Sequence, residues 1–115
     1  MQPKDIIHFW FQELSDKHRF AKDENLDSVM RERFGEIHKA AVAGEMFTWR
    51  VTAKGRLAEI VVLDQFSRNM FRGKPASFAQ EAQALTLAQE LVANGQDQNL
   101  SVEHRIGLRM YWEIK

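Results

Sequence analysis

Cysteine is absent from the 115 residues of this chain, proline occurs twice, and no uninterrupted apolar run exceeds four residues. The absence of cysteine excludes disulfide bonds, thiolate metal ligands and cysteine nucleophiles, and it is compatible with a reducing compartment. The apolar runs are too short to cross a bilayer, and no basic segment followed by a long apolar run opens the chain. We therefore expect a cytoplasmic protein without a membrane partner.

An excess of charge of one sign is also absent, because 16 basic residues balance 16 acidic ones. Proteins that bind nucleic acid mainly through bulk electrostatics carry a positive excess, so we expect no nucleic-acid partner. The length suits one globular unit, and no linker or low-complexity segment divides the chain. We therefore expect a single helical domain over residues 1–115.

Residues of high helical propensity fill the long spaces between the few prolines and glycines, which predicts about five helices and no strands. The first helix follows Pro3, a residue suited to the first helical position, and stops near Ser15. The second begins near residues 23–25, where acidic and cap-forming side chains cluster, and ends at Gly44.

The third predicted helix begins at a cap residue, Thr52, and runs to about Met70. Its middle is apolar on nearly every side, so we expect it at the centre of the core. A capping box of Ser77 and Gln80 would start the fourth helix, and Ser101 would cap the fifth. Because short connections make consecutive helices antiparallel neighbours, the predicted fold is all-α, with its helices in antiparallel hairpins.

Two further groups of apolar residues are expected to be buried. One is the short connector after the second helix, with Met46, Phe47 and Trp49. The other is a stripe along the fourth helix, formed by Phe78, Ala82, Leu85 and Val92.

The densest cluster of functional groups lies at residues 55–73. Asp64 and Arg68 are four residues apart on one helical strip, so the carboxylate can hold the guanidinium while its remaining donors stay available for a carboxylate or phosphate. Gln65 and Asn69 form a second such pair on the adjacent strip. The candidate ligand-binding residues are Arg56, Asp64, Gln65, Arg68, Asn69 and Arg72, with Trp49 as a stacking surface. The same groups could instead form a buried network that serves only fold specificity.

The same cluster carries a resemblance to a known family. It reads G-R-L-A from Gly55, followed by L-D-Q-F-S-R-N-M-F-R-G from Leu63, and the chain opens with F-W-F at residues 9–11. These segments resemble the signature of the DUF924 family of uncharacterised bacterial proteins, and the resemblance covers nearly the whole chain. It implies a tetratricopeptide-like fold of stacked helical hairpins. It implies no activity, because the function of the family is not established.

The resemblance also implies that more helices normally follow the last predicted one, so that 115 residues would be a shortened form of a longer helical array. Apolar Tyr111, Trp112 and Ile114 lie near the end of that helix, which has no stop signal. We expect a second copy of the chain to cover it, giving a homo-oligomer through the C-terminal helix, or its last turns to fray. A Trp112 side chain buried within its own chain would contradict this expectation.

Metal sites and activated nucleophiles are not indicated by the sequence. The four histidines lack metal-binding spacing, so we expect no metal and no cofactor. Ser67 lies in the densest cluster, but no nucleophile elbow surrounds it, and the resembling family commonly has proline there.

Three functions therefore remain open. The first is a non-enzymatic binding module in which Arg68 contacts an anionic small molecule or an acidic peptide. The second is a hydrolase that uses Asp64 as a base or as an orienting group. The third is a structural domain that associates with its own copies through the apolar residues Ile106, Met110, Tyr111 and Trp112.

Overall fold

A computed structural model describes residues 1–15, 18 and 22–114, with the backbone alone for residues 110–114, and this part of the chain is all-α without a strand. Five helical rods account for most of it. They are α1 (Pro3–His8) continued by the π-helical turn η1 (Phe9–Glu13); α3 (Glu24–Val42); α4 (Ala53–Val61) continued by the π-helical turn η3 (Val62–Phe66) and α5 (Ser67–Met70); α6 (Glu81–Ala93); and α7 (Val102–Ile114). Three short 3₁₀ turns connect them, η2 (Phe47–Val51), η4 (Pro75–Ser77) and η5 (Gln96–Asn99).

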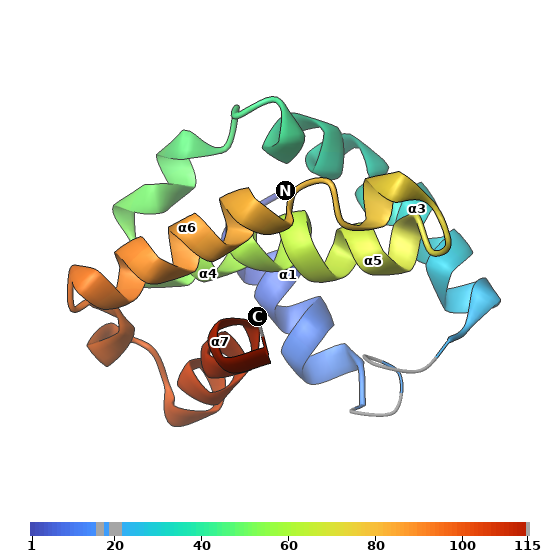
Figure 1. The fold of residues 1–115 in the computed structure, drawn as a ribbon. Helices are drawn as coiled ribbons and strands as arrows, with labels where there is room; N and C mark the ends of the chain where they lie inside the picture. The colour runs from blue at the N-terminus through green and yellow to red at the C-terminus, as the bar shows by residue number, and fades with distance from the viewer. Residues whose placement is uncertain (16–17, 19–21, 115) are drawn as a thin grey trace.

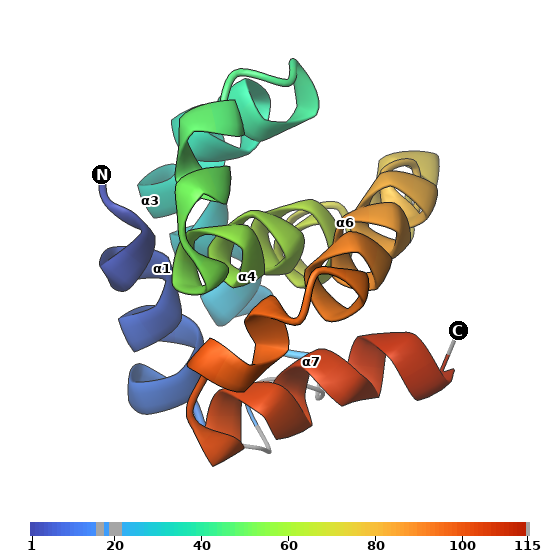
Figure 2. The ribbon, with the colours of Figure 1, turned by 90° about the vertical axis from the view of Figure 1, so that its left-hand side faces the viewer.

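The rod formed by α4, η3 and α5 occupies the middle of the molecule, as predicted for the third helix. Figure 1 shows α4 and α5 in line, with α6 running alongside them. α1 packs on α4, α3 packs on η3 and α5, and α7 packs on α6. Figure 2 places α7 at the edge of the molecule away from α3. The central rod is therefore covered from several directions, and its apolar residues from Leu57 to Leu63 are fully buried.

The first rod contains three consecutive buried aromatic residues, Phe9, Trp10 and Phe11. Three neighbours span about 200° of a regular helix, which is wide for one buried face. They lie in the π-helical turn η1. There Phe9 meets Phe34 of α3 and Phe66 of η3, with ring centroids 4.7 and 5.8 Å apart, which builds the aromatic centre of the core.

The helix starts agree with the predictions except at one place. Thr52 accepts a hydrogen bond from the Gly55 backbone N–H, and the Ser101 hydroxyl accepts one from the His104 N–H. The predicted capping box of Ser77 and Gln80 is wrong. Ser77 lies in η4 and donates to the Lys74 carbonyl oxygen, while Gln80 occupies the cap position of α6 without a side-chain hydrogen bond.

The predicted buried stripe of the fourth helix is also wrong. Phe78 is 58% exposed and Val92 is 40% exposed, Ala82 is exposed, and Leu85 is half-buried. The buried face is instead formed by Ala84, Leu87, Ala88 and Leu91. Because α6 begins only at Glu81, Phe78 lies outside the helix, and the packing of α6 on α4 selects a different strip.

The apolar connector is only partly buried. Met46 is buried, Trp49 is half-buried, and Phe47 is exposed. The side chains of Met110, Tyr111 and Trp112 lie outside the described residues. No described helix combines the length and the apolar character needed to cross a membrane.

Candidate functional site

The predicted site residues follow one another along the central rod but do not share a face. Between α4 and α5 the rod contains the π-helical turn η3, which has one more residue than a regular turn. An extra residue rotates everything after it by about 100° relative to a regular helix. The prediction assumed a regular helix throughout, from which the rod departs at this turn, and Arg72 lies beyond the end of α5 at Met70.

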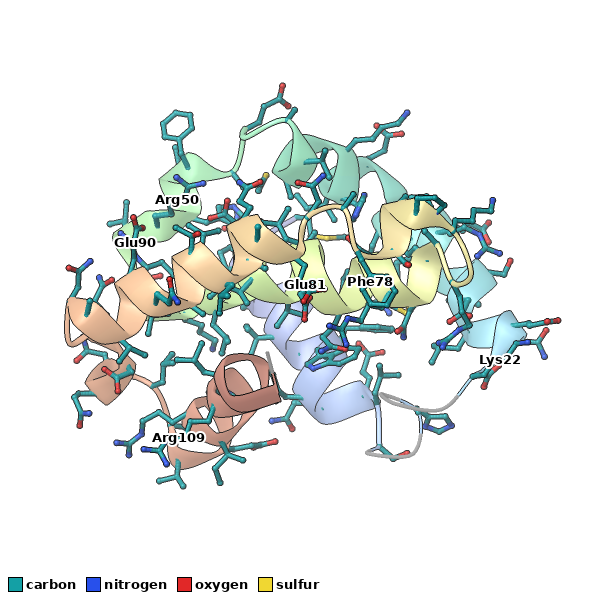
Figure 3. The ribbon with its side chains drawn as sticks, viewed as in Figure 1. Lys22, Arg50, Phe78, Glu81, Glu90 and Arg109 are labelled. Atoms are coloured by element: carbon teal, nitrogen blue, oxygen red, sulfur yellow. The ribbon has the colours of Figure 1, made fainter. Side chains whose placement is uncertain are left out.

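Arg68 lies between two carboxylates and above an aromatic ring. Its Nη2 is 3.7 Å from Oδ1 of Asp64 and 4.0 Å from Oε2 of Glu81, and its Cζ is 5.2 Å from the centre of the Phe78 ring. Figure 3 shows Phe78 and Glu81 next to each other on one face. Together with Gln65, these residues are called the Arg68 cluster below.

The Arg68 guanidinium is held by charge without being used as a hydrogen-bond donor. Both N–O distances are longer than hydrogen bonds. Within the described part of the chain Arg68 donates no hydrogen bond, and its Nε is buried without a partner. Its side chain is about one-third exposed, so the other donors are accessible from the surface.

Asp64 is the buried member of the Arg68 cluster. It is 2% exposed, and its Oδ2 accepts a hydrogen bond of 3.3 Å from Nε2 of Gln65. The predicted pairing of Asp64 with Arg68 is present as an ion pair. Phe78 and Glu81, which the sequence did not indicate, join them because the chain returns past α5 at the start of α6.

Asn69 and Arg72 face α3 and do not belong to the Arg68 cluster, contrary to the prediction. Asn69 Nδ2 lies 3.5 Å from the sulfur of Met30, and Asn69 is buried. Arg72 Nε donates a hydrogen bond of 2.9 Å to the buried carboxylate of Asp27. That hydrogen bond raises the pKa of Arg72. Both side chains therefore fasten α5 and its C-terminal extension to α3.

Arg56 lies near the start of the central rod, about 18 Å along the helix axis from Arg68, and Trp49 precedes the rod in η2. Arg56 donates to the Arg50 carbonyl oxygen at 3.1 Å, and its Nη1 lies 3.5 Å from Oε2 of Glu90. Trp49 is half-buried in η2. The prediction that these two residues share a site with Arg68 is therefore wrong.

An ion pair that the sequence analysis missed connects η2 to the same end of the rod. Glu59 is fully buried, and Arg50 donates to both of its carboxylate oxygens at 2.8 Å. These hydrogen bonds raise the pKa of Arg50. The sequence does indicate a buried ion pair here, because a glutamate inside an otherwise apolar helical run needs a partner for its charge.

A buried histidine and serine also bridge α3 and α5. His38 Nε2 is 2.7 Å from the Ser67 hydroxyl, which is also 2.7 Å from the Leu63 carbonyl oxygen. A carbonyl can only accept, so the hydroxyl donates to Leu63 and His38 donates to the hydroxyl. Burial lowers the pKa of His38, which favours its neutral form. Because His38 does not accept the hydroxyl proton, this pair does not activate Ser67 as a nucleophile.

Metal ligation finds no support in the described ranges, since no group of three or more His, Asp and Glu residues there could hold an ion.

The chain matches the model of a protein family over residues 6–113, and that family is described as "Bacterial protein of unknown function (DUF924)". A solved structure of a protein of unknown function from Agrobacterium tumefaciens is similar over 95% of this chain, with 35% identity and a TM-score of 0.84. This chain spans 61% of the length of that protein. Comparison of this chain with curated proteins gave no match.

Proposed function

Since the chain belongs to the DUF924 family of bacterial proteins of unknown function, we propose, from its own site, that it is a non-enzymatic binding module centred on Arg68. The observation that carries the proposal is that Arg68 is accessible, held between Asp64 and Glu81, and donates no hydrogen bond within the described residues. A guanidinium has five N–H donors in a planar fork that fits a carboxylate or a phosphate. A ligand with a carboxylate or phosphate would supply hydrogen-bond acceptors for the Arg68 N–H groups, which no described residue provides.

The charges around Arg68 restrict which ligands can bind there. Asp64 and Glu81 contribute two negative charges against one positive charge, so they repel a molecule that carries only negative groups. A ligand with an anionic group beside hydrogen-bond donors or a positive charge satisfies Arg68 and Glu81 together. An acidic peptide, with its backbone N–H groups, or a small zwitterion fits this description, and the exposed Phe78 ring offers it an apolar surface.

The wider setting is part of the same proposal. We place the site in a tetratricopeptide-like stack of hairpins, as the family resemblance implies, and we place the protein in the cytoplasm, as its cysteine-free sequence without a long apolar run led us to expect. No observation on the described residues favours the hydrolase alternative, because Asp64 is buried and accepts from Gln65.

Replacement of Arg68 by alanine tests this site. In a thermal-shift screen with free glutamate, other amino acids and a tetraglutamate peptide, we expect at least one probe to raise the melting temperature of the wild-type protein. Arg68→Ala should abolish that rise and lower the free energy of unfolding by about 1–3 kcal/mol without unfolding the protein, because the buried Asp64 loses its ion-pair partner but keeps the hydrogen bond from Gln65.

Lys39→Ala is the matched control, because Lys39 is an exposed basic residue on α3 that forms no ion pair with a described residue and lines neither surface cavity. Its response to the probes should equal that of the wild-type protein. Unfolding of Arg68→Ala would show that the Arg68 cluster is structural, and a screen without any stabilising probe would contradict the binding function.

A second candidate function, self-association through α7, is favoured by a cavity of about 430 Å³ between α6, η5 and α7. Val102 and Ile106 line it and are 63% and 58% exposed. Its walls carry opposite charges, with Asp97 on η5 and Arg109 on α7. A copy related by a twofold axis can pair such walls reciprocally, so we propose that a second copy of the chain occupies this cavity.

Sedimentation velocity at several concentrations tests the self-association. We expect the sedimentation coefficient of the wild-type protein to rise with concentration and that of Ile106→Lys to stay at the monomer value. Val29→Lys, at a valine 49% exposed on α3, should behave like the wild-type protein. A wild-type monomer at every concentration, or an equal effect of both substitutions, would refute the dimer.

A further inference from the structure

A second surface cavity, of about 420 Å³, lies where α1, α3, α4 and α7 come together. It shares no residue with the Arg68 cluster. Its ionisable lining consists of five basic side chains and one acidic side chain, Lys4, His8, Arg33, Lys54, His104 and Asp5. They come from four different helices, so the cavity exists only in the folded chain.

The positive charge of this cavity is only partly compensated. Neither Lys4 nor Lys54 forms an ion pair with any described residue. Arg33 lies 3.4 Å from Glu13 and is thereby neutralised. The one acidic group, Asp5, accepts a hydrogen bond of 2.7 Å from the Gln2 backbone N–H at Oδ2 and keeps its negative charge, so it offsets one of the two lysine charges. The two lysines therefore face the cavity with a net positive charge.

His104 is held at the cavity by the close approach of α7 to the first rod. A Cβ atom on Gly107 would lie 2.6 Å from Cε1 of Phe11, so the two elements touch there. One turn earlier, the His104 ring packs on Phe11 with 4.7 Å between the ring centroids. Burial lowers the pKa of His104, Glu103 opposes this, and the charge of Lys54 lowers it further. Lys54 and His104 also line the same cavity, so the two basic groups lie in one site.

We propose that this cavity binds a phosphate group, either as free inorganic phosphate or on a small phosphorylated molecule, through Lys4, Lys54, His8 and His104. A tetrahedral dianion has enough acceptor oxygens for several donors arriving from different helices, and it compensates two lysine charges at once. The volume lies in the range of small-molecule sites. The zero net charge of the chain argues against a nucleic-acid polyanion as the source of the phosphate.

Isothermal titration calorimetry with inorganic phosphate, and separately with glycerol phosphate, tests the proposal on the full chain. We expect saturable binding of at least one of them below about 10 mM. Lys54→Gln should weaken this binding about tenfold, since it removes one charge-assisted contact. The control Lys74→Gln, at an exposed lysine outside the cavity, makes the same change in net charge and should leave the affinity unchanged.

Sulfate provides a readout of the histidines, because it remains a dianion at neutral and mildly acidic pH. Protonation of His104 adds positive charge beside Lys4, Lys54 and Arg33, against Asp5 and Glu103. Because the pKa of His104 is lowered, sulfate should bind more tightly at pH 5.5 than at pH 7.5. His104→Gln should reduce this pH dependence.

The two phosphate probes distinguish whether the site takes free inorganic phosphate or a phosphorylated small molecule. Equal affinities assign free phosphate, and a clear preference for the ester assigns a phosphorylated small molecule. Absence of binding by both probes, or equal losses in Lys54→Gln and Lys74→Gln, would overturn the site. Failure here leaves the Arg68 cluster untouched, because the two sites have no residue in common.

Discussion

Arg50→Ala is expected to lower the free energy of unfolding by about 3 kcal/mol, because it leaves the buried carboxylate of Glu59 without its partner. Glu59 is fully buried in the last turn of α4, and both of its oxygens accept hydrogen bonds of 2.8 Å from Arg50. The value lies at the low end for a broken buried pair, because the Arg50 side chain is itself 31% exposed and water can reach this edge. Urea unfolding followed by circular dichroism measures the difference.

Two further variants separate the loss of the pair from the loss of packing. Arg50→Ala combined with Glu59→Leu should recover much of the stability, because the buried charge has been replaced by an apolar side chain. Arg33→Ala should change the free energy of unfolding by about 0.5 kcal/mol or less, since its pair with Glu13 is exposed. A double variant as unstable as the sum of its single variants would contradict this account.

Gly55→Ala is expected to destabilise the protein by about 2–3 kcal/mol, although alanine normally favours a helix over glycine. A Cβ atom at Gly55 would overlap the carbonyl oxygen of Trp49 in η2. That oxygen belongs to the backbone, so the overlap is relieved only if η2 moves away from α4. Such a movement also disturbs Arg50, the residue after Trp49, and with it the ion pair to Glu59. Thermal denaturation measures the loss.

Gly35→Ala on α3 is the matched control, because a Cβ atom there would meet nothing within 4 Å. We expect it to raise the stability by about 0.5–1 kcal/mol through helix propensity alone. If Gly55→Ala stabilised the protein in the same way, the close approach of η2 to α4 would be excluded.

The Arg68 cluster shows how far the sequence could predict the site. The neighbourhood of Asp64 and Arg68 follows from their spacing of four residues, and it is present. The parallel prediction for Gln65 and Asn69 fails, because Gln65 stays with Asp64 while Asn69 turns to Met30. A π-helical turn has no local sequence signal comparable to a cap or a proline. Its place in the rod could therefore not be predicted.

The contacts across the central rod show a second limit. Arg72 pairs with Asp27, 45 positions earlier in the chain, and His38 meets Ser67 across 29 positions. No spacing rule connects residues so distant, because their approach depends on how α3 packs on α5. Several polar residues of the 55–73 segment therefore hold neighbouring helices together. The sequence had left such a structural role open as the alternative to a ligand site.

Local signals in the sequence determined the helical class, the approximate helix ends and the central position of the third helix. These signals are helix propensity, capping residues and apolar periodicity, and all three can be read directly from the sequence. Which strip of α6 is buried, which arginine keeps its donors, and where basic residues gather around a cavity depended on packing between elements. The physical reason is range. A cap or a helical repeat acts within about four residues, whereas the environment of Arg68 or Lys54 is set by side chains that only the folded core brings together.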